Sequence, residues 1–309
     1  MDYKDPRAIL IAGPTASGKS SAAIKLAQEC NGAIINADSM QVYRELRILS
    51  ARPSEDDEAL VPHYLYGTVA AAKAYSTGMW VEEVATVLKA VRSEGRTPIL
   101  VGGTGLYFYA LENGLSPMPD IPVEVREKWR EKLATQGVRP LYDALKACDK
   151  PTAERLKPND SQRIVRALEV MEATGVSLGE WHARDNSTPV LAGDDIVRLV
   201  ISADRQEIYR RCDRRLDTMI EAGGLDEVRD LLALKLDARL PAMKALGVPQ
   251  LGEYLRSEVE LEYAIEKAKT ETRRYAKRQL TWLKRNMIAW NHINEQQLEK
   301  FNSKLLSFI

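Results

Sequence analysis

A short stretch near the N-terminus has the residue types and spacing of a phosphate-binding loop. It consists of Gly13, Pro14, Thr15, Ala16, Ser17, Gly18, Lys19 and Ser20, in the pattern G-x-x-x-x-G-K-[ST]. The glycines let backbone N–H groups turn inward around a phosphate chain, and the following helix contributes the positive end of its dipole. Lys19 supplies a positive charge for phosphate oxygens, and the hydroxyl of Ser20 suits Mg²⁺. The stretch therefore predicts a phosphate or diphosphate ligand, without indicating which one.

A carboxylate follows the next apolar run of the chain. Asp38 comes directly after the strand-like residues 32–37. At the carboxyl end of a strand beside a phosphate loop, it would lie in the ligand crevice of a doubly wound sheet. There it can bind Mg²⁺ through water or take a proton from an attacking nucleophile, although capping of the next helix is an open alternative. Gln41 carries an amide that can pair with an adenine edge, or it is simply a polar loop residue.

Two further segments combine a turn or helix start with polar side chains. Thr104 lies in the glycine-rich turn 102–105, where it can contact a phosphate or a base, or cap the following helix. Arg163 and Arg166 lie one helical turn apart, just after the helix-start residues 157–160. Two arginines in that position suit contacts with an anionic backbone, and a solvated helix face is an equally good interpretation.

The clearest charge asymmetry lies in residues 267–285. Lysines and arginines there are interleaved with Tyr275 and Trp282, and Glu271 is the single acidic residue. A basic helix carrying aromatic side chains is typical of an RNA-facing surface. The alternative is a solvated helix whose apolar side chains pack inward.

The composition excludes several classes of protein. The chain has 309 residues, of which 45% are hydrophobic and 28% charged, which is typical of a globular protein and not of a disordered chain. Its 44 Lys and Arg balance 44 Asp and Glu, which excludes a globally basic nucleic-acid coat. Three scattered cysteines and three scattered histidines offer no zinc-site spacing. Without a signal peptide or an apolar run of about 20 residues, we expect a cytoplasmic protein with no membrane contact.

Strand-like and helix-like segments alternate in the first part of the chain. Apolar runs of strand length lie at 7–12, 32–37, 64–69 and 98–102, and helical spacing lies at 17–30, 77–92 and 106–112. This alternation predicts an α/β fold, in which a parallel sheet is covered by helices.

A proline-rich stretch at 115–122 ends that alternation, and residues 123–184 are mostly helical, with one helix at 161–174. An apolar run at 196–201 then predicts a strand that rejoins the sheet. Helical spacing follows at 205–222, 225–234, 241–255 and 261–289. We therefore expect a core of residues 1–115 and 190–309, with a helical C-terminal region, interrupted by a helical insertion at 116–189.

Five segments together resemble the bacterial tRNA dimethylallyltransferase (isopentenyltransferase) family. They are GPTASGKS, ADSMQVYR, GGTGLY, KPNDSQRIVRALEV and AKRQLTWLKR, in this order between about residue 9 and residue 290. The resemblance implies a P-loop NTPase-like fold and a prenyl transfer. The N6 amine of the tRNA adenosine just 3′ of the anticodon would attack C1 of dimethylallyl diphosphate, and diphosphate would leave. The implied partners are the tRNA anticodon stem-loop and dimethylallyl diphosphate, with Mg²⁺ as cofactor and the target base flipped out of its stack.

The resemblance also implies roles for individual residues. Asp38 would be the general base, Thr15 would lie near the bridging oxygen of the diphosphate, and Lys19 and Ser20 would bind diphosphate and Mg²⁺. Arg215 matches a second arginine on the diphosphate, with the adjacent Arg214 as the alternative register.

The tRNA-contacting positions that the resemblance implies lie in several segments of the chain. They are Asp38, Ser39, Met40, Gln41, Thr104, Arg126, Gln162, Arg163, Ile164, Val165, Arg166, Lys277, Arg278, Gln279 and Lys284. The family often carries an arginine near Gly247, where this chain reads Gly-Val-Pro-Gln, so no tRNA contact is carried over there.

The main alternative is a P-loop kinase of a nucleotide or small metabolite. Such a kinase would share the phosphate loop, the parallel sheet and a helical insertion that acts as a lid. It leaves the basic segment 267–285 unexplained. No coiled-coil repeat demands a dimer, so we expect a monomer in either case.

Overall fold

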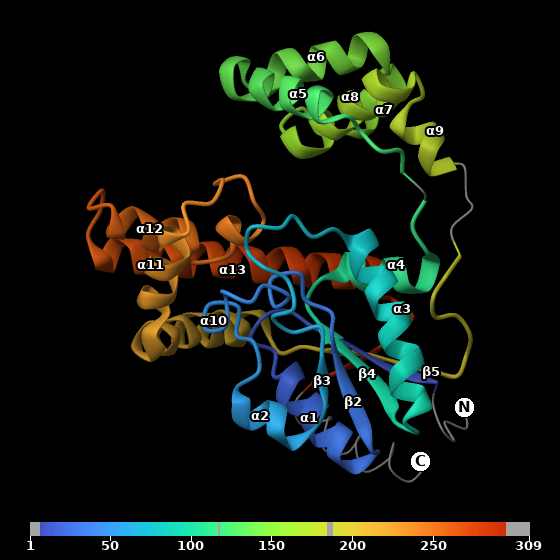
Figure 1. Ribbon diagram of the computed structural model, residues 1–309, viewed down its shortest axis with the longest axis vertical. Coiled ribbons are helices and arrows are strands. Elements are labelled where there is room, and N and C mark those ends of the chain that lie inside the picture. The colour runs from blue at the N-terminus through green and yellow to red at the C-terminus, as the bar shows by residue number, and fades with distance from the viewer. Residues whose placement is uncertain (1–6, 117, 184–187, 295–309) are drawn as a thin grey trace. The chain divides into compact units, whose positions relative to one another are not determined.

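A computed structural model describes residues 7–116, 118–183 and 188–294 of the chain. The chain forms two compact units (Figure 1). The core consists of Met1–Glu112 and Val190–Ile309, and the insertion consists of Asn113–Pro189. Among the described residues, no helix combines the length and the apolar character needed to cross a membrane.

The core is built on a parallel sheet. In the described part of the chain it has six strands in the order β3-β2-β4-β1-β5-β6, and every neighbouring pair is parallel. The strands are β1 (Ala8–Ala12), β2 (Gly32–Asn36), β3 (His63–Tyr64), β4 (Thr97–Gly102), β5 (Ile196–Ile201) and β6 (Asn291–Ile293). After the insertion the chain returns to the sheet as β5, which pairs with β1 on one side and β6 on the other. The expected α/β class is confirmed.

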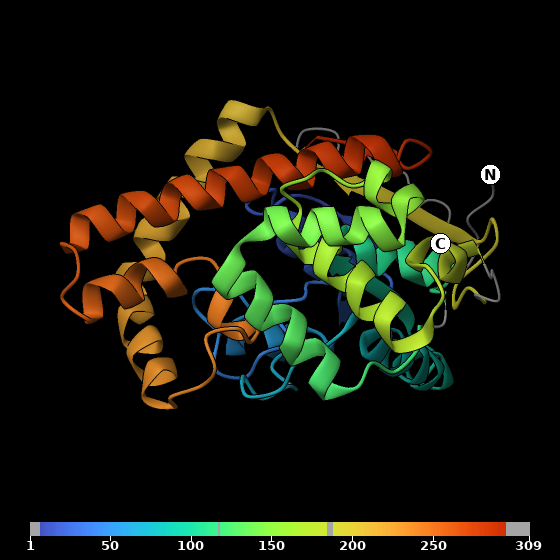
Figure 2. The same cartoon turned by 90° about the horizontal axis from the view of Figure 1, so that it is seen from above.

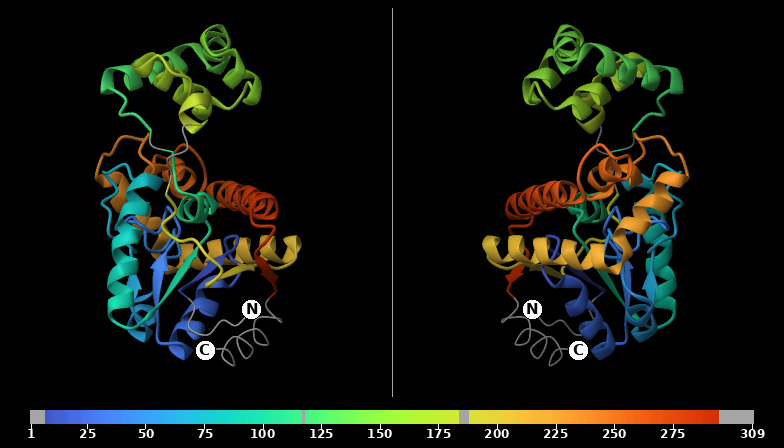
Figure 3. Two further views of the ribbon diagram at one scale, coloured as in Figure 1. Left: turned by 90° about the vertical axis from the view of Figure 1, so that its right-hand side faces the viewer. Right: turned by 90° about the vertical axis from the view of Figure 1, so that its left-hand side faces the viewer.

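Helices cover both faces of this sheet (Figures 1 and 3). The helices of the core are α1 (Lys19–Glu29), α2 (Glu55–Leu60), α3 (Thr77–Ser93), α4 (Gly105–Asn113), α10 (Arg205–Met219), α11 (Leu225–Ala233), α12 (Val248–Leu255) and α13 (Leu261–Asn286), of which α12 packs on α13 and α11 packs on α12, and not on the sheet. Alternate residues of β1 point to opposite faces. Ile9 and Ile11 pack with Leu26 of α1, whereas Leu10 packs on the face where Trp80 of α3 and Leu283 of α13 are buried.

Trp80 is the largest fully buried side chain and joins α3 to the end of β2. Its indole Nε1 donates a hydrogen bond to the carbonyl oxygen of Asn36 at 2.8 Å. Its ring stacks on Tyr107 of α4 with 4.2 Å between centroids. A buried indole needs such a partner for its N–H, and here that partner is the last residue of a central strand.

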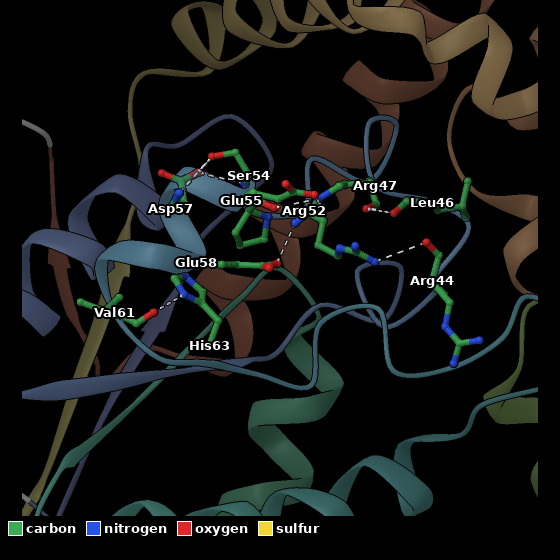
Figure 4. Close-up of polar contacts among 12 residues, drawn as sticks. Arg44, Leu46, Arg47, Arg52, Ser54, Glu55, Asp57, Glu58, Val61 and His63 are labelled. Carbon is green, nitrogen blue, oxygen red and sulfur yellow. Dashed lines mark hydrogen bonds and ion pairs between the residues drawn. The ribbon is translucent and has the colours of Figure 1, made fainter.

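The C-terminal helices of the core hold the loop that follows β2. The carboxylate of Glu227, on α11, accepts hydrogen bonds from the backbone N–H groups of Arg47, Ile48 and Leu49 at 2.7, 2.7 and 2.9 Å. Figure 4 shows Arg47 paired through its guanidinium with Glu55 of α2, at 3.0 Å. The loop therefore has a fixed shape, although it contains no helix or strand.

The insertion has a separate hydrophobic core. Its helices are α5 (Val123–Gln136), α6 (Val138–Cys148), α7 (Lys150–Arg155), α8 (Ser161–Thr174) and α9 (Leu178–Ala183), seen from above in Figure 2. Trp129, Leu141 and Leu145 pack there against Ile164 and Leu168 of α8. The Asp160 carboxylate caps the N-terminus of α8 by accepting a hydrogen bond from the N–H of Arg163. The predicted helix start at residue 161 is confirmed.

The structure corrects several expected elements. Of the expected strand 64–69 only Tyr64 belongs to a strand, β3, because Leu65 and Gly67 adopt φ of 64° and 62° and turn the chain. The single helix expected over 241–255 is wrong, since Gly247 at φ 91° separates a short 3-10 turn from α12. The helix expected to reach residue 222 ends at Met219 and passes into a π turn.

The end of the described chain differs from what the sequence predicted. Strand β6 pairs with β5 beyond the end of α13, whereas a helix was expected to reach residue 289. Three residues are too few for a period-two pattern to stand out, so no strand was expected there. Residues 295–309 lie outside the described part of the chain.

We expect Trp80→Phe to lower the free energy of unfolding by about 1–2 kcal/mol. The phenyl ring keeps most of the stacking on Tyr107 but leaves the carbonyl of Asn36 without its donor. Urea unfolding followed by circular dichroism measures the change. Met79→Leu, at the exposed neighbouring position, is the control. Equal stability of Trp80→Phe and the wild-type protein would contradict the role given to this hydrogen bond.

Candidate active site

The phosphate-loop residues form the connection between β1 and α1. Gly18 adopts φ 83° immediately before the first residue of α1. A Cβ on Gly13 would lie 2.4 Å from the carbonyl oxygen of Ile201 on β5 and 2.7 Å from Ser17 Oγ. Only glycine fits this close approach of two chains. The loop therefore follows the end of a central strand and opens a helix, as its sequence pattern requires.

Lys19 lies over the loop that precedes it. Its ammonium group donates a hydrogen bond to the carbonyl oxygen of Pro14 at 3.2 Å. Burial lowers the pKa of Lys19 to about 8, the nearby Asp38 carboxylate opposes this shift, and the Arg215 guanidinium adds to it. Because burial and a like charge act together against its positive form, the ammonium group is well placed to gain from an anionic ligand.

Arg215 reaches the loop from α10. Its guanidinium Nη2 donates to the hydroxyl oxygen of Thr15. Burial lowers the pKa of Arg215, and Asp38 acts in the opposite direction. Arg214 is exposed instead. The structure thus brings Arg215, and not the adjacent arginine, to the phosphate loop.

Asp38 lies just beyond the end of β2, held by hydrogen bonds within its own turn. Its N–H donates to Asn36 Oδ1 at 2.8 Å, and its Oδ1 accepts from the N–H of Met40 at 3.0 Å. Its Oδ2 lies next to Gly103, 3.3 Å from the position of a Cβ there. Turns, and not a helix, follow Asp38, so the alternative that it caps a helix is wrong. One carboxylate oxygen stays available for chemistry.

Three tyrosines lie near enough to Asp38 to be affected by its charge. Burial raises the pKa of Tyr66, Tyr107 and Tyr275 above the ordinary value, and the charge of Asp38 is the second cause in each case. These tyrosines come from the segment after β3, from α4 and from α13, and of the three only Tyr107 is fully buried. Asp38 is itself partly exposed, and a carboxylate in this position can accept a proton from a bound substrate.

The turns after β2 and β4 are joined to each other. Thr104 Oγ1 accepts from the N–H of Ser39 at 2.9 Å, and its own N–H donates to the carbonyl of Ala37 at 3.3 Å. A Cβ on Gly102 would lie 1.9 Å from that same carbonyl oxygen, so glycine is required. The hydroxyl of Thr104 thus fixes the segment that carries Asp38.

Three predicted tRNA-contacting side chains are used within the protein. Gln41 Nε2 donates to the carbonyls of Ser50 and Ala51 at 3.0 and 2.7 Å, which favours the loop role over pairing with adenine. Ile164 and Val165 are buried in the core of the insertion. Their side chains have almost no exposed surface, so a contact with RNA at these two positions would have to involve the backbone.

The remaining predicted tRNA-contacting residues are distributed over both units. Within the insertion, Gln162 and Arg163 are exposed and Arg166 is partly exposed. Arg166 lies 3.6 Å from Glu169, and Arg126 on α5 is also partly exposed. On the core, Lys277, Arg278 and Lys284 are exposed along α13, whereas Gln279 is buried. Ser39 and Met40 are partly exposed next to Asp38.

An open groove of about 640 Å³ runs along α13. It is lined by Arg274, Lys277, Arg278, Thr281, Trp282, Arg285 and Asn286. The Trp282 ring packs so closely on Gly105 of α4 that a Cβ there would lie 2.1 Å from it. Cationic side chains beside an aromatic ring suit the backbone and bases of unpaired RNA.

A small cavity of about 80 Å³ adjoins Ser20 on the other side of the loop. Arg52, His63 and Tyr66 are among the residues that line it. Figure 4 shows the His63 ring directed at the carbonyl of Val61, 2.8 Å away. No group of three His, Cys, Asp or Glu among the described residues could hold a metal ion.

Several residues near Asp38 were not predicted to belong to this site. Asn36 holds Asp38, and the charge of Asp38 helps to raise the pKa of Tyr66 and Tyr275, although none of the three belongs to the phosphate-loop pattern. The proximity of Asn36 in sequence was the only available signal. The tyrosines are brought in by tertiary packing, which a single sequence does not reveal.

Comparison with family models gives two matches that together span most of the chain. The model described as IPP transferase matches residues 41–286, and the one described as Isopentenyl transferase matches residues 6–67. A tRNA dimethylallyltransferase of Rhodopseudomonas palustris (strain ATCC BAA-98 / CGA009) is 50% identical over 296 residues, covering 96% of this chain and 92% of that protein. A tRNA dimethylallyltransferase of Bradyrhizobium sp. (strain ORS 278) is 52% identical over 283 residues, covering 92% of each.

Solved structures give the same answer for the fold. A tRNA isopentenylpyrophosphate transferase from Bacillus halodurans superposes with a TM-score of 0.69 at 29% identity, covering 97% of this chain and 95% of that chain. A eukaryotic dimethylallyltransferase acting on tRNA gives a TM-score of 0.77 at 29% identity, covering 93% and 73%. These matches agree with the family to which the five sequence segments pointed.

We expect wild-type protein to bind inorganic diphosphate more tightly than Lys19→Met, with an advantage that shrinks above pH 8. The free site loses the Lys19 charge as the pH rises through a pKa of about 8, and binding must then take up a proton. The advantage should fall by up to about tenfold per pH unit there. Calorimetric titration at neutral and alkaline pH measures both affinities, and ionisation of the diphosphate cancels in the comparison.

The same shift has a consequence for stability. Between the pKa of about 8 in the folded protein and the ordinary lysine pKa of 10.5, the unfolded chain holds more protons on this lysine. The free energy of unfolding of the wild-type protein should therefore rise with pH in this window relative to Lys19→Met.

In the binding experiment, a wild-type advantage in diphosphate affinity that stays constant from neutral to alkaline pH would contradict the assignment of Lys19 to the diphosphate.

Proposed function

The chain belongs to the IPP transferase family, and we propose that it transfers a dimethylallyl group from dimethylallyl diphosphate to N6 of the tRNA adenosine just 3′ of the anticodon. One observation carries the proposal. Two partly buried cations, Lys19 and Arg215, are hydrogen-bonded to residues of the phosphate loop, and the Asp38 carboxylate lies close enough to affect the pKa of each. A prenyl transfer from a diphosphate needs an anion pocket for the leaving group beside an acceptor for the proton.

The phosphate loop stabilises the leaving group in this proposal. Breaking the C1–O bond leaves negative charge on the diphosphate, and Lys19, Arg215 and the N-terminus of α1 are fixed donors for that charge. Ser20, an exposed hydroxyl in the first turn of α1, fits Mg²⁺, which binds few protein oxygens and takes others from a phosphate ligand. When bound, Mg²⁺ supplies further charge neutralisation of the diphosphate.

Asp38 receives the proton of the attacking amine. The N6 lone pair forms a bond to C1, the C1–O bond to diphosphate breaks, and one N6 proton moves to Asp38 Oδ2. The other oxygen stays bonded to the N–H of Met40, which holds the carboxylate in one orientation. Thr15 Oγ1 accepts a hydrogen bond from Arg215 and is placed to contact the bridging oxygen of the diphosphate.

Each unit supplies part of the RNA-binding surface. Exposed Lys277, Arg278 and Lys284 on α13 suit contacts with the phosphate backbone, and Arg163 on α8 adds a cation from the insertion. An adenine stacked in the anticodon loop cannot reach a partly buried carboxylate, so the base must be flipped out.

Incubation with labelled dimethylallyl diphosphate, Mg²⁺ and unmodified tRNA tests the proposal. Nucleoside analysis should find the label on an adenosine next to the anticodon. A parallel incubation with ATP and small hydroxylated acceptors tests the kinase alternative. If phosphoryl transfer occurs there and the tRNA of the first incubation carries no label, the proposed function is wrong and the kinase alternative is favoured.

We expect Asp38→Asn to reduce kcat by about two to four orders of magnitude. The amide keeps the size of the side chain and can still accept from the N–H of Met40, but it cannot take up a proton. Steady-state kinetics with both substrates measures the change, and calorimetry with inorganic diphosphate checks that the anion pocket is intact. Turnover at the wild-type rate would remove Asp38 from the chemistry.

Arg163→Gln is expected to weaken tRNA binding without changing the affinity for dimethylallyl diphosphate. Losing one phosphate contact should lower the slope of log affinity against log salt by about one. Filter binding across a salt series measures that slope. Arg139→Gln, an exposed arginine on α6 of the same insertion, is the matched control. A parallel loss of both affinities would show that the two binding surfaces are not separate.

A further inference from the structure

We infer that Gln279 of α13 is a positioning residue that aligns the phosphate loop with the turn beside Asp38. Its side chain is buried, with 7% of its surface exposed. Oε1 accepts from the N–H of Thr15 at 2.9 Å, and Nε2 donates to the carbonyl of Gly103 at 2.9 Å. The inference rests on the proposed function, and it gives Gln279 a role different from the RNA contact that the family resemblance implied.

The bond to Thr15 fixes one peptide plane of the phosphate loop. The Pro14–Thr15 peptide is trans, so its C=O and N–H groups point to opposite sides. On one side the N–H is held by Gln279, and on the other the carbonyl accepts from the Lys19 ammonium at 3.2 Å. Gln279 thereby fixes the carbonyl to which the Lys19 ammonium group is hydrogen-bonded.

Thr15 extends this effect to a second cation. Its hydroxyl accepts from the guanidinium of Arg215, and its backbone is the segment that Gln279 holds. A shift of the Thr15 backbone would move the acceptor to which Arg215 is bonded. Both cations of the anion pocket therefore depend on one neutral amide.

The Nε2 end of the Gln279 amide fixes the turn that lies beside Asp38. A Cβ on Gly103 would lie 2.3 Å from Gln279 Nε2 and 3.3 Å from Asp38 Oδ2. The amide group thus lies where the phosphate loop and the turn after β4 approach each other. The position requires one donor and one acceptor without charge, since a charged group would perturb Asp38 and the cations.

The place of Gln279 on α13 adds a connection to RNA. Lys277 and Arg278 are exposed on the groove, whereas Gln279 projects from the buried face of the same helix. The helix proposed to contact tRNA therefore carries the amide that holds the diphosphate loop. A displacement of α13 would be transmitted directly to Thr15 and Gly103.

Gln279→Leu, Gln279→Glu and a control, Gln28→Leu at an exposed position on α1, test the inference. Leucine preserves the volume but removes both hydrogen bonds. Ionised glutamate can accept from Thr15 but cannot donate to Gly103, whereas protonated glutamate can do both. The measurements are KM for each substrate, kcat, affinity for inorganic diphosphate with Mg²⁺, and melting temperature.

For Gln279→Leu we expect about a tenfold rise in KM for dimethylallyl diphosphate and in the dissociation constant of inorganic diphosphate, with KM for tRNA within about twofold. In Gln279→Glu the diphosphate affinity, relative to wild type, should recover as the pH falls and the buried carboxyl is protonated. That recovery also tests the inference if the leucine variant does not fold. The control should behave as wild type.

Two results would overturn the inference. One is an unchanged diphosphate affinity in both Gln279 variants at every pH. The other is a rise confined to KM for tRNA, which would assign Gln279 to direct RNA contact. Failure of the proposed function gives a different result, since wild-type protein would then bind inorganic diphosphate but transfer no prenyl group to tRNA.

Discussion

The site depends on holding two cations and one carboxylate close together without letting them neutralise each other. Lys19 and Arg215 are both buried enough for their pKa values to be lowered, and Asp38 opposes the shift in each case. In the structure neither cation is bonded to Asp38. Their hydrogen bonds go to a backbone carbonyl and to the hydroxyl of Thr15. The positive charge therefore stays available for a diphosphate, and the carboxylate stays available for a proton.

This separation is achieved by neutral groups drawn from many elements. Asn36 and Thr104 fix the turn that carries Asp38, and Gln279 fixes the peptide beside Lys19. The parallel sheet provides the common edge at which these turns meet, because the carboxyl ends of β1, β2 and β4 lie side by side there. The C-terminal helices complete the site by bringing in Arg215 on α10 and Gln279 on α13.

Much of this could be predicted from the sequence, for physical reasons. Strand and helix periodicity gave the order of elements, and the phosphate loop and Asp38 follow strands directly, so local patterns place them. The resemblance to the family assigned Gln279 to RNA together with its basic neighbours, and a single sequence does not show which face of that helix is buried. Strand β6 and the break at Gly247 were missed because a few residues in a turn or edge strand carry too little pattern.

In the proposed reaction one site holds an allylic diphosphate at the phosphate loop and presents its C1 atom to the base beside Asp38. The most direct test is a crystal structure with the thio-analogue of dimethylallyl diphosphate and an anticodon stem-loop. We expect the diphosphate on Lys19 and Arg215, with N6 of an everted adenine between C1 and Asp38. An analogue bound elsewhere, or an adenine that remains stacked in the loop, would contradict this arrangement.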